Sequence, residues 1–190
     1  WQSTIGSDVD PVRNLVRTRV AASCAVRLAG NPSLLQPQHG CALVAGGGSA
    51  PQQAADGNNL SYWRAGTDQL PAEIVWVFTN RIALVEGVSI LNAGGASNEP
   101  LRTFRLDLSL DGVQYSPYVS GVLAGSEDLR NFETNTMVCR YVKVVMEDAC
   151  SAEGATLNEI SVRGSLIADA DQDGLGDDWE IQCFRSLAND

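Results

Sequence analysis

Short stretches in which apolar and polar residues alternate cover the middle of the chain and predict β-strands. The clearest is Thr103–Leu110, where apolar residues occupy every second position between Arg105, Asp107 and Ser109, as in a half-buried strand. Gly87 interrupts the apolar run 82–92 and predicts a bulge or bend. Asp111–Gly112 directly after the clearest strand predicts a tight hairpin. Strands are expected at 14–23, 73–79, 82–92, 103–110, 113–120, 139–146 and 156–163.

Seven or eight short strands of this kind predict an all-β fold, an antiparallel β-sandwich. Residues 30–59 are rich in Gly, Pro, Gln, Ala and Asn, which is typical of long loops. After Gly164 the pattern changes to an acidic segment followed by Trp179, Cys183 and Leu187 at helical spacing. We therefore expect a lead-in at 1–13, a sandwich at 14–164, and a loop with a short helix at 165–190.

The acidic segment 169–180 matches the formula of an EF-hand calcium loop at every position. Oxygen-bearing side chains fall at positions one, three, five, nine and twelve, and Gly174 takes position six, where a sharp turn excludes a Cβ. Position seven contributes a backbone carbonyl. The expected Ca²⁺ ligands are Asp169, Asp171, Asp173, Leu175, Asp177 and Glu180.

Two other interpretations of this segment were weighed. A solvated acidic linker would explain the charge but not the accompanying Gly174 and Glu180. A regulatory sensor exposes a methionine-rich groove, whereas this chain has one loop, no preceding helix, and methionines only at Met137 and Met146. We expect a structural calcium loop.

Charge and composition narrow the class of partner. The formal net charge is −10, which argues against nucleic acid and anionic membranes because both require clustered Lys and Arg. No run of 18 apolar residues is present, so no membrane-spanning helix is expected. Because the chain opens at Trp1 and ends abruptly in the segment 186–190, we expect a piece of a longer polypeptide, and the calcium loop favours an extracellular setting.

Five cysteines occur without a CxxC pair, and His39 is the only histidine, so a zinc site is not expected. Disulfides would suit an extracellular protein. Cys24–Cys41 is a plausible local pairing, and Cys139–Cys150 is the remaining one, although a strand lies between its two members. Cys183 would be free or paired beyond the chain.

Four segments resemble the discoidin-type domains, also called coagulation factor 5/8 C-type domains, and the related family 32 carbohydrate-binding modules. They occur in the family's order, as Asp56–Gly57–Asn58 followed by Trp63, Leu108–Gly112, Cys139–Val144 and Leu157–Gly164. The resemblance covers roughly residues 14–164. It implies an eight-stranded jelly-roll-like, galactose-binding-like sandwich that binds ligands at loops on one end. The tail resembles bacterial thrombospondin-type-3-like calcium repeats, which link domains in large secreted proteins.

The family resemblance also implies a second calcium ion. Its side-chain ligands map onto Asp56, Asn58, Ser61 and Glu159, with Ser61 replacing a family threonine. The alternative is that Asp56 and Asn58 make only an Asx-type turn. Glu159 discriminates between the two, because a carboxylate in an otherwise apolar strand is costly without a partner.

Sugar recognition requires an aromatic platform and polar groups for the hydroxyls. The expected ligand-binding residues are His39, Asn92, Arg102 and Tyr115, with Asn98 and Tyr118 as further candidates. Trp63 and Trp76 lie in or beside strands and are expected in the core.

Catalysis finds little support in the sequence. A Ser/His/Asp triad would depend on His39, and no GxSxG elbow surrounds a serine. We therefore expect a non-catalytic, calcium-dependent carbohydrate-binding module of a larger secreted or cell-surface bacterial protein, with a glycan and neighbouring domains as partners. The alternative is a structural or adhesive spacer without sugar binding.

Overall fold

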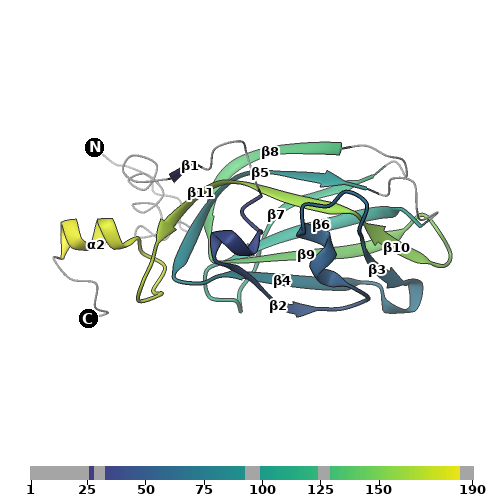
Figure 1. The fold of residues 1–190 in the computed structure, drawn as a ribbon, viewed down its shortest axis with the longest axis horizontal. Coiled ribbons are helices and arrows are strands. Elements are labelled where there is room, and N and C mark those ends of the chain that lie inside the picture. Colours follow the sequence, from purple (N-terminus) through teal and green to yellow (C-terminus); the bar gives the residue numbers. More distant parts are fainter. Residues whose placement is uncertain (1–25, 28–32, 93–98, 124–128, 185–190) are drawn as a thin grey trace, which may run out of the picture.

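Two antiparallel sheets face each other across a large apolar core in the computed structural model, which describes residues 26–27, 33–92, 99–123 and 129–184 (Figure 1). One sheet has the order β1 (Val26–Arg27), β11 (Glu159–Ala168), β5 (Arg81–Leu91), β8 (Leu129–Cys139). The other has the order β2 (Cys41–Gly46), β4 (Ala72–Phe78), β9 (Tyr141–Ala149), β6 (Leu101–Ser109), β7 (Ser116–Val122). A two-stranded ribbon pairs β10 (Gly154–Leu157) with β3 (Trp63–Gly66). The remaining elements are the 3-10 turns η1 (Pro37–His39), η2 (Pro51–Ala55) and η3 (Thr67–Gln69) and the helix α2 (Asp177–Cys183). The expected all-β antiparallel sandwich is confirmed.

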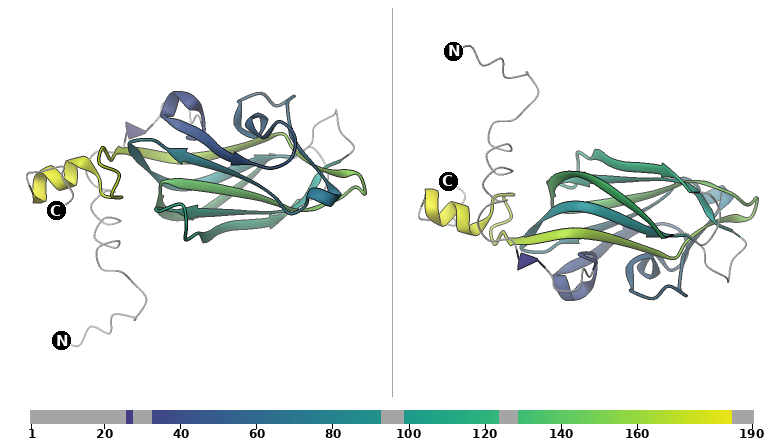
Figure 2. Two further views of the ribbon diagram at one scale, coloured as in Figure 1. Left: turned by 90° about the horizontal axis from the view of Figure 1, so that it is seen from below. Right: turned by 90° about the horizontal axis from the view of Figure 1, so that it is seen from above.

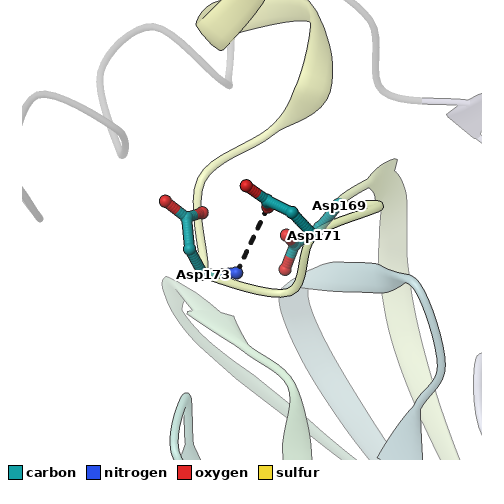
Figure 3. Close-up of side chains that lie close together, drawn as sticks. All are labelled: Asp169, Asp171 and Asp173. Carbon is teal, nitrogen blue, oxygen red and sulfur yellow. Dashed lines mark hydrogen bonds between the residues drawn. The ribbon is translucent and has the colours of Figure 1, made fainter. Parts of the chain in front are cut away.

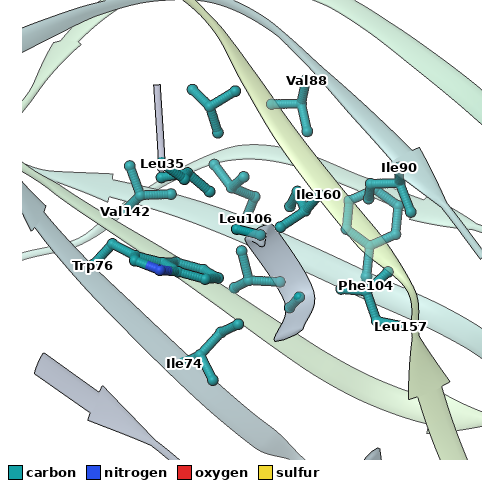
Figure 4. Packing of buried hydrophobic residues seen from close by; sticks show 14 of the residues in the cluster. Leu35, Ile74, Trp76, Val88, Ile90, Phe104, Leu106, Val142, Leu157 and Ile160 are labelled. Atoms are coloured by element: carbon teal, nitrogen blue, oxygen red, sulfur yellow. The ribbon is translucent and has the colours of Figure 1, made fainter. Parts of the chain in front are cut away.

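The core is built from the inward-facing residues of both sheets. Phe104 and Leu106 of β6, Ile74 of β4 and Ile160 of β11 are completely buried, and Trp76 is 3% exposed (Figure 4). Fully burying one such side chain stabilises the fold by roughly 1.5–3 kcal/mol. Trp63 is also completely buried, so the expected core placement of both tryptophans is confirmed.

β4, β5, β6 and β9 lie where the sequence predicted strands, and β7 begins three residues later than expected. The single strand expected at 156–163 is divided into β10 and β11. Four strands were missed: β1, β2, β3 and β8. β2 lies inside the stretch 30–59 that was interpreted as loops, so that interpretation was wrong for Cys41–Gly46. The strand expected at 14–23 lies outside the described residues.

The expected bulge at Gly87 is confirmed, because the register between β5 and β8 shifts between Val85 and Gly87. A matching shift lies between Arg163 and Gly164, on the β11 side of β5. Gly164 has φ +154°, and a Cβ there would lie 2.0 Å from the Leu84 carbonyl oxygen, so only glycine fits this bulge.

The expected two-residue hairpin at Asp111–Gly112 is wrong. β6 ends at Ser109 and β7 begins at Ser116, so the connection is longer. Asp111 nevertheless organises it, because its Oδ1 accepts hydrogen bonds from the backbone N–H groups of Val113 and Gln114, each at 2.8 Å.

The predicted disulfide Cys139–Cys150 is also wrong. The nine residues of β9 separate the two cysteines, and an extended strand of that length spans roughly 26 Å, whereas a disulfide requires Cα atoms within about 7 Å. Cys41, Cys139, Cys150 and Cys183 are free thiols in the described part of the chain. Burial raises the pKa of Cys41 to about 12. The other predicted partner, Cys24, lies outside the described residues.

The helix α2 lies at one end of the sandwich, which distinguishes that end from the other (Figure 2). α2 follows β11 at what we call the helix end, where the chain turns at Asn80, Leu110 and Arg140. β3 and β10 lie at the opposite end, the loop end, together with Glu99 and Arg102. β11 continues to Ala168, so residues 165–168, expected in the acidic segment, pair with β5 in the sheet. Within the described residues, no helix is long and apolar enough to cross a membrane.

Candidate functional site

Three aspartates of the acidic loop converge at the helix end, directly after β11. Asp169, Asp171 and Asp173 each place one carboxylate oxygen within 4.8 Å of the others (Figure 3). Asp169 is completely buried, Asp171 is half-buried and Asp173 is exposed. Like charges at such distances repel each other, and a cation between them would offset this repulsion.

The backbone of the loop turns sharply around these carboxylates. Gly174 has φ +93°, as expected for position six of the formula. Leu175 N–H donates to Asp173 Oδ1 at 2.7 Å, and Ala170 N–H donates to Asp177 Oδ1 at 2.7 Å. These bonds hold one oxygen of Asp173 and one of Asp177.

Several carboxylate oxygens of the loop are buried without a hydrogen-bond partner in the described structure. They are both oxygens of Asp169, Oδ2 of Asp171 and Oε2 of Glu180. Burial raises the pKa of Asp169 to about 6. Burial, together with the charges of the loop aspartates, raises the pKa of Glu180 to about 7. A solvated acidic linker would leave such groups in water, whereas Glu180 is 2% exposed.

The predicted ligand set therefore fits a hard cation that takes oxygen ligands, such as Ca²⁺. Asp169, Asp171 and Asp173 surround one point, and the charge of Asp177 contributes to the raised pKa of Glu180, so these two carboxylates lie near each other. Leu175 lies in the turn between them, and its side chain packs on the apolar cluster of Ile82 and Ile167.

The second predicted set is also brought together, at the loop end of β11. The Ser61 hydroxyl lies 2.9 and 2.8 Å from the two oxygens of Asp56. Asp56 and Asn58 accept bonds from the backbone N–H groups two residues on, which is the Asx pattern. Glu159 reaches this loop from β11 and accepts from the Gly57 N–H at 3.2 and 3.3 Å.

Glu159 adds to this loop a carboxylate that an Asx turn does not require. Its carboxylate is half-buried and faces a second carboxylate, Asp56. Burial, with the charge of Asp56, raises the pKa of Glu159 to about 7. Two carboxylates, an amide and a hydroxyl are thus gathered at this loop, and they are the hard oxygen donors that Ca²⁺ prefers.

Two of the expected sugar-binding residues are buried and bonded to the protein's own backbone. His39 is 8% exposed, and its Nδ1 lies 2.9 Å from the Ser33 carbonyl oxygen. Asn92 is 1% exposed, donates to the Leu101 carbonyl at 2.9 Å and accepts from the Leu101 N–H at 3.1 Å. Their burial and these bonds to the backbone argue against a role in sugar binding and give both side chains a structural role.

The other two lie at opposite ends of the sandwich and cannot contact one sugar together. Arg102 is exposed at the loop end and pairs with Asp148 at 3.2 Å. Tyr115 lies in the connection at the helix end, with the Lys143 ammonium 4.1 Å from its ring centre. Of the further candidates, Tyr118 donates to the Val85 carbonyl, and Asn98 lies outside the described residues.

A polar group at the loop end was not predicted. Arg64 donates to both oxygens of Glu99, at 2.6 and 3.0 Å, and to the Glu153 carbonyl at 3.4 Å. The Glu99 backbone in turn accepts from Thr156. These residues come from β3, β10 and the segments beside them, and no short motif joins them, so only the fold brings them together.

Comparison with known proteins identifies the family. The F5/8 type C domain matches residues 39–160. No curated protein matches the chain. Among solved structures, the C-terminal domain of a chitobiase from Bacteroides fragilis is similar, with 21% identity, a TM-score of 0.58, and 67% of this chain and 95% of that chain covered.

Two further structures come from Clostridium perfringens. One is the module CpGH89CBM32-5 in complex with GalNAc-β-1,3-galactose, with 19% identity, a TM-score of 0.55, and 65% of this chain and 94% of that chain covered. The other is the family 32 module of NanJ in complex with galactose, with 15% identity, a TM-score of 0.53, and coverage of 64% and 90%. At these identities the structures show a shared fold. Since the family match spans well over half of the sequence, the chain belongs to the F5/8 type C domain family.

Proposed function

We propose that this domain is a non-catalytic carbohydrate-binding module of a larger secreted or cell-surface bacterial protein. The observation that carries the proposal is the family match over residues 39–160, joined to structural neighbours that are family 32 modules in complex with glycans. Fold alone does not determine function, so the proposal depends on a specific surface and a specific test.

The surface we favour is the loop end. Arg102 is 58% exposed there, and among the described residues its guanidinium forms an ion pair with the similarly exposed Asp148 carboxylate. Such a pair in water is worth about 0–1 kcal/mol, so a ligand can displace it at little cost. Arg64, Glu99 and Glu153 lie at the same end and add donors and acceptors for hydroxyl groups.

We further propose that Ca²⁺ occupies the loop 169–180 and the loop of Asp56 and Glu159. In the first, the buried carboxylate oxygens of Asp169 and Glu180 without partners support the proposal. In the second, the support is the half-buried Glu159 carboxylate beside Asp56. The role of the ions would be structural, holding irregular backbone that the sheets do not hold.

One observation favours the alternative, a structural or adhesive spacer that binds no sugar. A sugar-binding surface normally includes an exposed aromatic ring. At the loop end, the described residues offer only the half-buried Tyr62 beside the completely buried Trp63. The two functions therefore have to be separated by experiment.

A glycan array separates them. Wild type, Arg102→Ala and the control Arg81→Ala, which removes an exposed arginine at the helix end, are compared with and without EDTA. We expect binding by wild type and Arg81→Ala and at least a tenfold loss in Arg102→Ala. If no glycan binds the wild type at millimolar ligand, the spacer function is correct instead.

A further inference from the structure

The acidic loop is attached to the sandwich by polar side chains that are far apart in the sequence. Arg140, in the turn between β8 and β9, donates to the Gln172 carbonyl at 2.8 Å and to the Gln172 side-chain oxygen. Gln172 Nε2 in turn donates to Asn80 Oδ1 at 2.7 Å, and the Asp169 N–H donates to the Asn80 carbonyl at 3.1 Å. Gln172 stands between the metal-facing residues Asp171 and Asp173.

The backbone of Arg140 is itself held by two strands of the five-stranded sheet, at the end of β6 and the end of β4. Its backbone N–H donates to the Ser109 carbonyl at 2.8 Å, and its carbonyl accepts from the Phe78 N–H at 2.9 Å. The residue is 8% exposed. The loop is therefore bonded to a buried residue whose own backbone is held by the sheet.

Apolar contacts also attach the acidic loop to the sandwich. Leu110 and Leu175 pack against a small cluster formed by Ile82, Leu84, Val138 and Ile167. A Cβ added at Gly176 would lie 2.8 Å from Ile167 Cγ2, so the loop lies against β11 with no room for a side chain. A linker that merely followed the domain would not pack in this way.

The Arg140 charge can act on the loop in two opposite ways. Its hydrogen bonds fix Gln172, whose φ of +70° is unfavourable for a non-glycine residue, and so hold the aspartates in place. Its charge lies close enough to Asp169 to favour the ionised carboxylate, and it would also repel a bound cation. Positioning predicts weaker metal binding when Arg140 is removed, whereas repulsion predicts tighter binding.

We propose that Arg140 is a positioning residue that clamps the metal-binding loop onto the end of the sandwich, so that a bound cation stabilises the whole sandwich. This inference rests on the proposed calcium loop and is independent of glycan binding. Residues that orient a metal site without touching the metal typically contribute tenfold to a hundredfold in affinity.

The test compares wild type with Arg140→Met, which keeps most of the aliphatic stem. The control is Arg130→Met, the same substitution near the start of β8, where Arg130 pairs with Ile90 at the loop end. Tb³⁺ replaces Ca²⁺ in one titration, because Trp179 lies inside the loop and can sensitise its luminescence. Thermal unfolding with and without calcium is followed by the fluorescence of the buried Trp63 and Trp76.

We expect Arg140→Met to bind Tb³⁺ about tenfold more weakly and to lose most of the calcium-dependent rise in the unfolding midpoint, while Arg130→Met behaves as wild type. Unchanged or tighter Tb³⁺ binding in Arg140→Met would overturn the positioning role. Absence of Tb³⁺ luminescence in the wild type would refute the metal site itself, and this result is distinct from a failure of the role proposed for Arg140.

A second variant covers the case in which Arg140→Met does not fold. Gln172→Gly removes the side chain that joins Arg140 to Asn80, and glycine adopts the positive φ at this position without strain. We expect the same weakening of Tb³⁺ binding in a folded protein. Wild-type affinity in Gln172→Gly would contradict the proposal.

Discussion

Replacing Asp169 by Asn should change stability in opposite directions with and without calcium. Asp169 is completely buried, and neither of its oxygens has a hydrogen-bond partner in the described structure. Its pKa is raised from 3.8 to about 6 by burial, and at 1.36 kcal/mol for each unit the ionised group would cost about 3 kcal/mol at neutral pH. Because solvent reaches the exposed Asp173 beside it and screens the charge, we take roughly 1–2 kcal/mol as the cost of ionised Asp169 in the folded protein.

Without calcium, Asp169→Asn should therefore raise the free energy of unfolding at pH 7 by about 1 kcal/mol, since the amide removes the charge but still lacks partners. For a domain of this size the midpoint would rise by about 2–4 °C. With calcium at a hundred times its dissociation constant, wild type gains about 2.7 kcal/mol from this site. The variant should lose that gain.

The measurement is thermal unfolding in calcium and in EDTA, with Asp178→Asn as the matched control. Asp178 is exposed and stands at position ten, which supplies no ligand, so the same charge is removed without loss of the site. A variant that is less stable than wild type in EDTA, or that keeps the full calcium-dependent gain, would refute the reasoning.

Three further predictions follow from the structure. In EDTA, the free energy of unfolding should fall as pH rises from about 4.5 to 7. The reason is that Asp169 and Glu180, with pKa values near 6 and 7 in the folded protein, keep protons that the unfolded chain has already released. Calorimetry across this pH range should show the fall in EDTA and not in calcium. Asn92→Ala should destabilise the protein by about 2–3 kcal/mol in urea unfolding, because the N–H and carbonyl of Leu101 lose their partner, and the folded variant should bind glycans as wild type does. Gly164→Ala should destabilise by more than Gly121→Ala, because the new Cβ meets a backbone carbonyl at 2.0 Å in the first and side chains in the second.

The strands that could be predicted are those in which one face is apolar and the other polar. β6 alternates with a period of two because Phe104 and Leu106 face the core while Arg105 faces outward. β8 was missed because it is an edge strand whose residues before Val138 are largely exposed or half-buried, so its sequence carries little apolar signal. β3 has only four residues, one of them Arg64.

The candidate metal loop could be predicted because its ligands are local in the sequence, so that spacing alone places them around one point. The clamp could not be predicted, since Asn80, Arg140 and Gln172 become neighbours only when turns from different strands meet. The structural role of Asn92 could not be predicted for the same reason. A polar residue at the end of a strand resembles a ligand contact until the Leu101 backbone is placed opposite it.

The two proposed ions have separable consequences because they lie at opposite ends of β11. The ten residues of β11 place Glu159 and Ala168 roughly 30 Å apart. An ion that stabilises one end of the sandwich therefore need not affect a ligand bound at the other end. Glu159 pairs with Leu91, beside the buried Asn92 at the loop end, whereas Asp169 follows Ala168 at the helix end. The calcium site at Asp169 could therefore affect glycan binding only by changing the fraction of the domain that is folded.

We therefore expect Glu159→Gln to weaken glycan binding at 25 °C and Asp169→Asn to leave it unchanged, although each variant should lose one bound Ca²⁺ in equilibrium dialysis. The first substitution removes the carboxylate that reaches the loop of Asp56 from β11. This loop adjoins the proposed sugar-binding end. The second alters only the clamped loop, and a domain that stays folded keeps the loop end intact. Equal losses of glycan affinity in both variants would mean that calcium acts on the domain as a whole, and the separation of roles between the two ends would be wrong.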